Sequence, residues 1–183
     1  MSARRVAIVV QRYGVEVNGG AEQHARWLAE RLAEPSTAGE ATEVTVLTTC
    51  ALDYITWADH YPAGEETING VRVLRARHAV PRRLTGLTRL LWDGTFVLNG
   101  GMVRPSRRPE LVLASTPSIG AGLLGRRLAD RYDVPFGIVV QHPTGGIPPF
   151  ADNDFENNSS GASLVLGAGE APRPVHTGDL ATP

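Results

Sequence analysis

Residues 5–33 read RVAIVVQRYGVEVNGGAEQHARWLAERLA and contain two different hydrophobic patterns. The apolar run that starts the stretch, Arg5 to Val10, is typical of a parallel strand covered on both faces. From Ala21 to Ala33 apolar residues recur every three or four positions, which predicts an amphipathic helix. A Gly-Gly pair and several polar residues separate the two segments. The stretch therefore predicts a strand, a glycine-containing loop and a helix.

The same alternation continues along the chain. Apolar and β-branched runs predict further strands over residues 43–48, 71–76, 110–114 and 134–141. Helical spacing predicts one helix over residues 84–98 and a second that begins after a Ser115 or Thr116 cap and ends near Tyr132. Asn69-Gly70 is expected to form a turn, and Asn99-Gly100-Gly101 is expected to end the first of these helices. Strands alternating with helices predict an α/β fold, a doubly wound parallel sheet of the Rossmann-like type.

The last 41 residues have a different composition. Residues 143–183 contain 12 Gly or Pro residues, and their only sizeable apolar run is Ala162 to Leu166. Such a stretch buries too little apolar surface to offset the entropy of ordering it. We therefore predict a folded domain over residues 1–142 and a mostly irregular tail over residues 143–183.

Composition limits the classes of function and location. The 183 residues carry a formal net charge of -1, which disfavours nucleic acid as a partner. No apolar run approaches the ~20 residues of a membrane span, and the single cysteine, Cys50, fits a reducing cytoplasm. Five arginines surround the predicted helix at 84–98 and form either a solvated face or a contact with anionic lipid or a phosphorylated acceptor: Arg82, Arg83, Arg104, Arg107 and Arg108.

The first candidate binding loop runs from Arg12 to Gly20 and contains Gly19 and Gly20. Ligands of open parallel sheets bind beyond the carboxyl ends of the strands, and this loop follows the first strand. Glycines before a helix allow backbone N–H groups to approach an anion such as phosphate. The loop has neither the G-x-G-x-x-G pattern nor a Walker lysine, so a dinucleotide cofactor or a P-loop ATPase is disfavoured. Simple turn geometry is the alternative interpretation.

The second candidate loop, residues 48–62, mixes acidic and aromatic residues. Asp53 could bind sugar hydroxyls, while Tyr54 and Trp57 could cover an apolar ring face. A surface loop held by one buried tryptophan is the alternative. We expect Cys50 to be a small buried side chain and not a nucleophile, because no base can be assigned to it.

A third candidate is His142, at the end of the last predicted strand. A histidine there could bind an anion or transfer a proton near neutral pH, although a structural role is the alternative. The five histidines show no metal-ligand spacing, so they do not predict a zinc site. No metal or other cofactor is expected for this chain.

Taken together, three segments resemble one family. They are VAIVV at residues 6–10, NGGAEQHARWLAERLA at 18–33 and EVTVLTTCA at 43–51. This combination is similar to the N-terminal domain of retaining GT-B glycosyltransferases, in particular the family-4-like bacterial group. The resemblance extends over about residues 5–142, and the Gly-Gly-Ala-Glu segment at the start of a helix is its most specific part.

The resemblance implies transfer of a sugar from a nucleotide-sugar donor to an acceptor, with retention of anomeric configuration and without a metal. It implies that Gly19 and Gly20 lie against the donor phosphates. A histidine at the end of the last strand contacts the donor sugar in this family, which makes His142 the catalytic candidate and Gln141 its alternative. The residues expected to contact acceptor or sugar are Asn18, Glu22, Asp53, Tyr54 and Trp57.

The chain departs from the family pattern after His142. Family members have a second domain that binds the nucleotide and supplies paired glutamates together with Arg and Lys, whereas residues 143–183 contain no lysine and one arginine. The sequence thus predicts a truncated glycosyltransferase half, inactive unless a missing or separately encoded C-terminal domain completes it. A carbohydrate- or phosphate-binding module and a nonfunctional remnant are the alternatives. The donor sugar and the acceptor are not fixed by the sequence.

Overall fold

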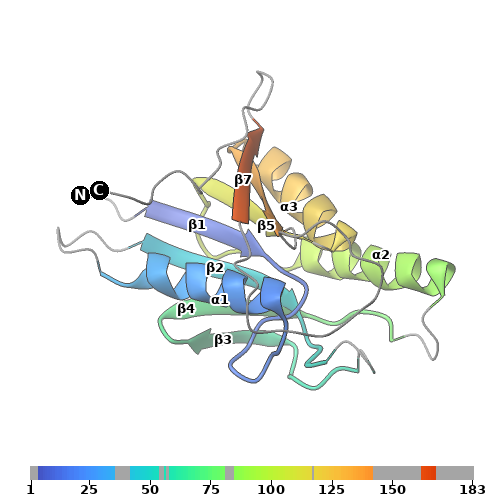
Figure 1. The fold of residues 1–183 in the computed structure, drawn as a ribbon. Coiled ribbons are helices and arrows are strands. Elements are labelled where there is room, and N and C mark those ends of the chain that lie inside the picture. The colour runs from blue at the N-terminus through green and yellow to red at the C-terminus, as the bar shows by residue number, and fades with distance from the viewer. Residues whose placement is uncertain are drawn as a thin grey trace, which may run out of the picture.

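The computed structural model describes residues 4–35, 42–53, 56, 58–80, 85–116, 118–141 and 162–167. These residues form one seven-stranded sheet with helices on both faces (Figure 1). The elements in chain order are β1 (Arg4–Val9), α1 (Gly20–Ala33), β2 (Thr42–Thr49), β3 (Gly64–Ile68), β4 (Val71–Ala76), α2 (Gly86–Met102), β5 (Leu111–Ser115), α3 (Ile119–Tyr132), β6 (Phe136–Gln141) and β7 (Ala162–Gly167). The predicted α/β class and Rossmann-like arrangement are confirmed.

The sheet has the strand order β3-β4-β2-β1-β5-β6-β7, with β1 at its centre. The five strands from β4 to β6 in this order are parallel, and the two edge strands run antiparallel to their neighbours. In the central register Ile8 of β1 pairs with Val46 of β2 and with Leu113 of β5. The carboxyl ends of these five strands therefore lie at a common edge of the sheet. Strands β2 and β4 lie on one side of β1, and strands β5 and β6 lie on the other side.

Alternate residues of the strands face two separate cores. Ala7 and Val9 belong to the cluster that α2 and α3 cover, whereas Ile8 and Val10 belong to the cluster that α1 covers. Helix α1 contributes Ala25 and Ala29 to the second cluster, with Leu28 and Leu32 packed at its margin. The predicted helix face is thus confirmed, and it explains why the central strands are apolar on both sides.

Strand β3 is an element that the sequence did not predict. Its residues, Gly-Glu-Glu-Thr-Ile, are largely exposed and lack the apolar alternation of a half-buried strand. It forms a hairpin with β4 through Asn69 and Gly70, which both have positive φ angles of 48° and 81°. The predicted Asn-Gly turn is confirmed, because these two residue types tolerate that backbone conformation.

Two predicted helix boundaries are wrong. Helix α2 continues through Gly100 and Gly101 to Met102, because the side of the helix at Gly100 packs closely on α3. A Cβ built at Gly100 would lie 2.5 Å from a methyl of Leu124, so this glycine serves helix packing and not helix termination. The side-chain cap of α3 is Ser118, whose hydroxyl accepts a hydrogen bond from the Ala121 N–H at 3.1 Å, and not Ser115 or Thr116.

The described part of the predicted tail is β7. It contains the apolar run noted in the sequence, and it pairs with all of β6 from Phe136 to Gln141. This segment of residues 143–183 therefore extends the sheet of the preceding domain.

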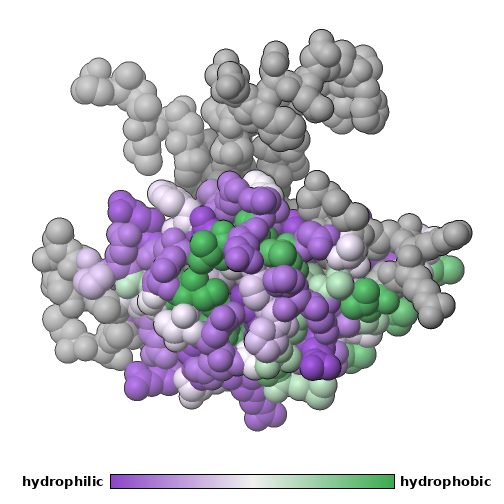
Figure 2. All heavy atoms as spheres, turned by 90° about the horizontal axis from the view of Figure 1, so that it is seen from below, coloured by the Kyte–Doolittle hydropathy of each residue, from purple (hydrophilic) through white to green (hydrophobic). Residues whose placement is uncertain are grey.

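The surface over α2 is unusual for a sheet-covering helix. Its outward residues are large and apolar, and their exposed fractions lie between 56% and 81%: Leu87, Leu90, Leu91, Leu98 and Met102. Figure 2 shows hydrophobic residues on the surface at the right-hand end of the molecule, where Figure 1 places the start of α2.

Candidate functional site

The loop between β1 and α1 is held by a buried ion pair. An Nη atom of Arg12 lies 2.6 Å from Oε1 of Glu22, and Arg12 Nε donates to the same oxygen at 3.1 Å. Arg12 also donates to the carbonyl oxygen of Leu52 at 3.2 Å. One side chain thus joins the β1–α1 loop, the first turn of α1 and the loop after β2.

Helix α1 holds the other side of the same loop. Arg26 donates to the carbonyl oxygen of Val15 at 2.8 Å and to that of Gly14 at 3.2 Å. Val17 N–H closes a further turn on the Gly14 carbonyl. Helix α1 therefore holds the backbone of the loop at Gly14 and Val15, just before the chain enters the helix.

Gly19 and Gly20 have different structural roles. Gly19 is the N-cap residue of α1 with φ 146°, and a Cβ built on it would lie 2.2 Å from the Glu22 carboxylate. Gly20 has no atom within 4 Å of a corresponding Cβ. Gly19 is therefore required by the backbone and by the Arg12–Glu22 pair, while the space beside Gly20 is open.

The N-terminus of α1 has no side-chain cap in the described structure. The first helical hydrogen bond runs from Gln23 N–H to the Gly19 carbonyl at 2.9 Å, so the preceding N–H groups lack an intrahelical acceptor. The carboxylate of Glu22 lies in this turn, but Arg12 neutralises it. This helix end can consequently offer N–H groups and the positive end of its dipole to an anion.

A pocket of about 310 Å³ opens beside this helix end. Its lining residues come from the β1–α1 loop and from the loop after β2: Arg12, Glu16, Asn18, Leu52 and Asp53. Asn18 and Asp53, both predicted as acceptor or sugar contacts, are thus brought together. Glu22 adjoins the pocket through its ion pair with Arg12. The other three predicted site residues, Tyr54, Trp57 and His142, lie outside the described residues.

The carboxylate of Asp53 already has local partners. The backbone N–H of Thr56 donates to one oxygen at 2.7 Å, and the Thr56 hydroxyl donates to the other at 2.9 Å. These two hydrogen bonds from Thr56 therefore fix the orientation of the Asp53 carboxylate.

Cys50 is a buried residue without catalytic surroundings. It has no exposed surface, and its carbonyl accepts hydrogen bonds from the N–H groups of His60 and Tyr61. Burial, with a smaller contribution from Asp59, raises the pKa of the thiol to about 11. The predicted structural role of Cys50 agrees with these findings, because a nucleophilic thiol needs a lowered pKa.

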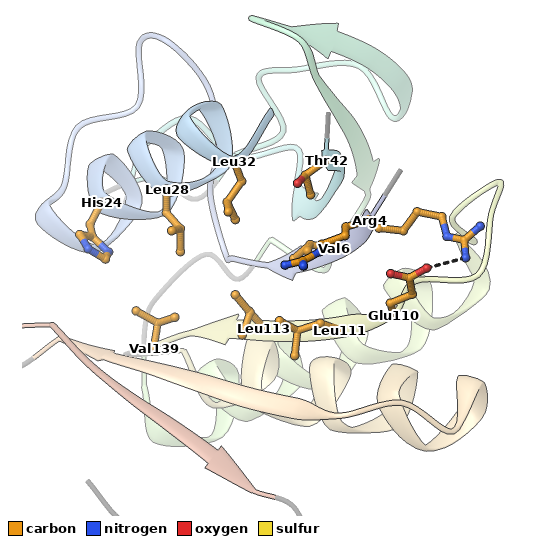
Figure 3. Close-up of a pocket in the computed structure, with 11 residues that line it drawn as sticks. Arg4, Val6, His24, Leu28, Leu32, Thr42, Glu110, Leu111, Leu113 and Val139 are labelled. Carbon is orange, nitrogen blue, oxygen red and sulfur yellow. Dashed lines mark hydrogen bonds and ion pairs between the residues drawn. The ribbon is translucent and has the colours of Figure 1, made fainter. Parts of the chain in front are cut away.

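A larger pocket lies elsewhere in the described structure. It has a volume of about 520 Å³ and lies between α1 and the β1–β5 part of the sheet, with Val139 of β6 at one side (Figure 3). Its walls are mainly apolar side chains such as Leu28, Leu111 and Leu113, with the Arg5–Glu110 ion pair at one end. It runs along the sheet face rather than across the carboxyl ends of the strands, where ligands of this architecture bind. We therefore place the candidate site at the smaller pocket.

Two other kinds of feature are absent among the described residues. No group of three or more His, Cys, Asp or Glu side chains there could hold a metal ion. No described helix combines the length and apolar character needed to cross a membrane.

The sequence placed Arg12 and Glu16 in the first candidate loop but assigned neither of them a role in the site. Arg12 follows the first strand, but its partner Glu22 is ten positions away and meets it only through the bend of the loop. Glu16 lines the pocket from the same loop. The only sign of the pair in the sequence is an arginine before the glycine pair and a glutamate after it, Arg12 and Glu22, and this pattern alone predicts an ion pair only weakly.

The fold and this edge of the sheet define a Rossmann-like domain with a pocket between its first two strand-end loops. The model of the glycosyl transferase 4-like domain matches residues 19–173, which is most of the chain, so the chain belongs to this family. The match begins at Gly19, and it extends past β7. A search of curated proteins found no match.

Proposed function

We propose that this chain is the acceptor-side domain of a retaining GT-B glycosyltransferase, one that transfers a sugar from a nucleotide-sugar donor to an acceptor. The single observation that carries the proposal is the uncapped N-terminus of α1 beside the pocket lined by Asn18 and Asp53. Family membership supports glycosyl transfer as the chemistry. The bacterial origin and the cytoplasmic location inferred from the sequence stay predictions.

The proposed division of labour follows from charge and space. The N–H groups at Gly20 and the following residues would bind donor phosphate oxygens, since the helix dipole favours anions there. Asn18 and Asp53 would bind hydroxyl groups of the sugar or acceptor in the adjoining pocket. Gln141, the last residue of β6, or His142, the next residue in the sequence, would contact the donor sugar.

Transfer itself requires further cations. The leaving diphosphate gains charge in the transition state, and preorganised positive groups must offset it. In the described pocket the only positive side chain is Arg12, which Glu22 neutralises. We therefore assign catalysis to this domain together with a donor-binding domain, and we expect this chain alone to bind without turning over. No metal or other cofactor enters the proposed reaction.

Calorimetric titration with UDP and with GDP tests the proposed phosphate site. Gly20→Val places a branched side chain in the open space beside the helix end, so binding should fall by at least tenfold. Gly122→Val is the matched control, because Gly122 of α3 also has open space around it. Equal affinities for the parent and Gly20→Val would refute the phosphate site, and loss in the control alone would do the same.

A further inference from the structure

The outer face of α2 is unlike the exposed face of an ordinary surface helix. The inward side buries Trp92, Phe96 and the carboxylate of Asp93, so the helix is anchored to the domain by that side. The opposite side consists of Leu87, Leu90, Leu91, Gly94, Leu98 and Met102. At 3.6 residues per turn these six positions fall within an arc of about 120°. No polar side chain interrupts that arc.

The neighbouring helix extends the apolar surface. Helix α3 packs on α2, with Gly120 against Asp93 and Leu124 against Gly100. It exposes Ile119 and Leu123. An apolar face of this extent on a folded domain indicates an interaction surface, because isolated exposed leucines are common but a continuous stripe is not.

The segments that precede and follow α2 in the sequence are rich in arginine. Residues 77–109 contain seven arginines and one acidic residue, Asp93. Asp93 is buried and accepts hydrogen bonds from the Ser118 hydroxyl and the Gly120 N–H, so it does not offset the surface charge. Among the arginines Arg77, Arg89 and Arg104 are exposed. The positive charge is therefore local, since the whole chain carries a formal net charge of -1.

We propose that the outer face of α2 binds an anionic lipid surface, with its leucines in the interface and the flanking arginines on the lipid headgroups. An amphipathic helix with a wide apolar face and basic flanks is the form that lies in a membrane interface. A second copy of the chain fits this face less well, because a two-fold contact would bring the arginine-rich flanks together. The proposal does not depend on the proposed sugar transfer.

Vesicle flotation of the full chain tests this proposal. The parent should float with phosphatidylcholine vesicles that contain phosphatidylglycerol, and high salt should weaken this binding. The double variant Leu91→Ser with Leu98→Ser should lower the partition coefficient roughly tenfold to a hundredfold. Arg104→Ala, in the exposed segment directly after α2, should lower it about fivefold on the anionic vesicles only. Both leucines are exposed, so the double variant should keep the melting temperature of the parent.

Trp27→Ser provides the matched control, since Trp27 is equally exposed but lies on α1, on the other face of the sheet. It should bind vesicles as the parent does. Failure of the parent to float, retention of binding by the leucine variant, or equal loss in Trp27→Ser would each overturn the proposal. A dimer in light scattering that dissociates in the leucine variant, without vesicle binding by the parent, would show that a second copy covers this face and would overturn it too.

Discussion

The neighbouring residues Gly19 and Gly20 should respond in opposite ways to the same substitution. Gly19→Ala forces alanine into a backbone conformation with φ 146°, which costs about 1–3 kcal/mol. The new methyl would also lie 2.2 Å from the Glu22 carboxylate and so displace it from Arg12. Weakening a buried ion pair adds to the loss, and we expect a total of about 2–5 kcal/mol. Gly20→Ala should be neutral or should stabilise by up to about 1 kcal/mol, because alanine favours the helix and has free space.

Urea unfolding followed by circular dichroism measures both effects, provided that the slope of the transition is unchanged. The combination of Gly19→Ala with Glu22→Ala separates the two causes, because removal of the carboxylate leaves only the backbone strain. Free energies of unfolding that agree within about 0.5 kcal/mol for Gly19→Ala and Gly20→Ala would refute the reasoning.

Two further predictions concern buried groups. Arg12→Met leaves the Glu22 carboxylate buried and unpaired and should cost about 3–5 kcal/mol, whereas Arg31→Met, in an exposed pair of similar length, should cost less than about 1 kcal/mol. Equal losses in urea unfolding would contradict this. For Cys50, a pKa of about 11 leaves about one thiol in a thousand ionised at pH 8, so iodoacetamide should label the folded chain very slowly and the unfolded chain rapidly. Since folding raises the pKa of Cys50, its protonated form stabilises the fold at neutral pH, and this contribution should decline as the pH rises from about 9 to about 11; rapid labelling in native buffer would show that the thiol is accessible.

The sequence predicted the elements whose patterns are set by burial. Strand β4 agrees with its predicted range of 71–76, and the bounds of β1 and α1 differ from prediction by one residue. These elements contribute side chains to the two cores. Their apolar runs or helical spacing therefore predict where each element begins and ends.

The sequence did not predict features that depend on contacts between distant segments. Strand β3 lies at an edge of the sheet, where polar side chains can remain exposed. It is held by its hydrogen bonds to β4 and not by burial of its own side chains. Gly100 looked like a helix end but is a packing position against Leu124. In the candidate site, the glycine pair and Asp53 could be identified from the loops that carry them. The Arg12–Glu22 pair could not, because it forms only when the β1–α1 loop folds back on the helix.

The most direct test of the central claim is amide NMR of the isotope-labelled chain during titration with UDP. We predict shifts at the N–H groups of Gly19 to Gln23 and at Asn18 and Asp53, because these residues form the helix end and the adjoining pocket. We predict no comparable shifts at Leu111 and Leu113, which line the larger apolar pocket. Shifts confined to that larger pocket, or no shift at the start of α1, would contradict the assignment of this helix end as the phosphate site of a glycosyltransferase.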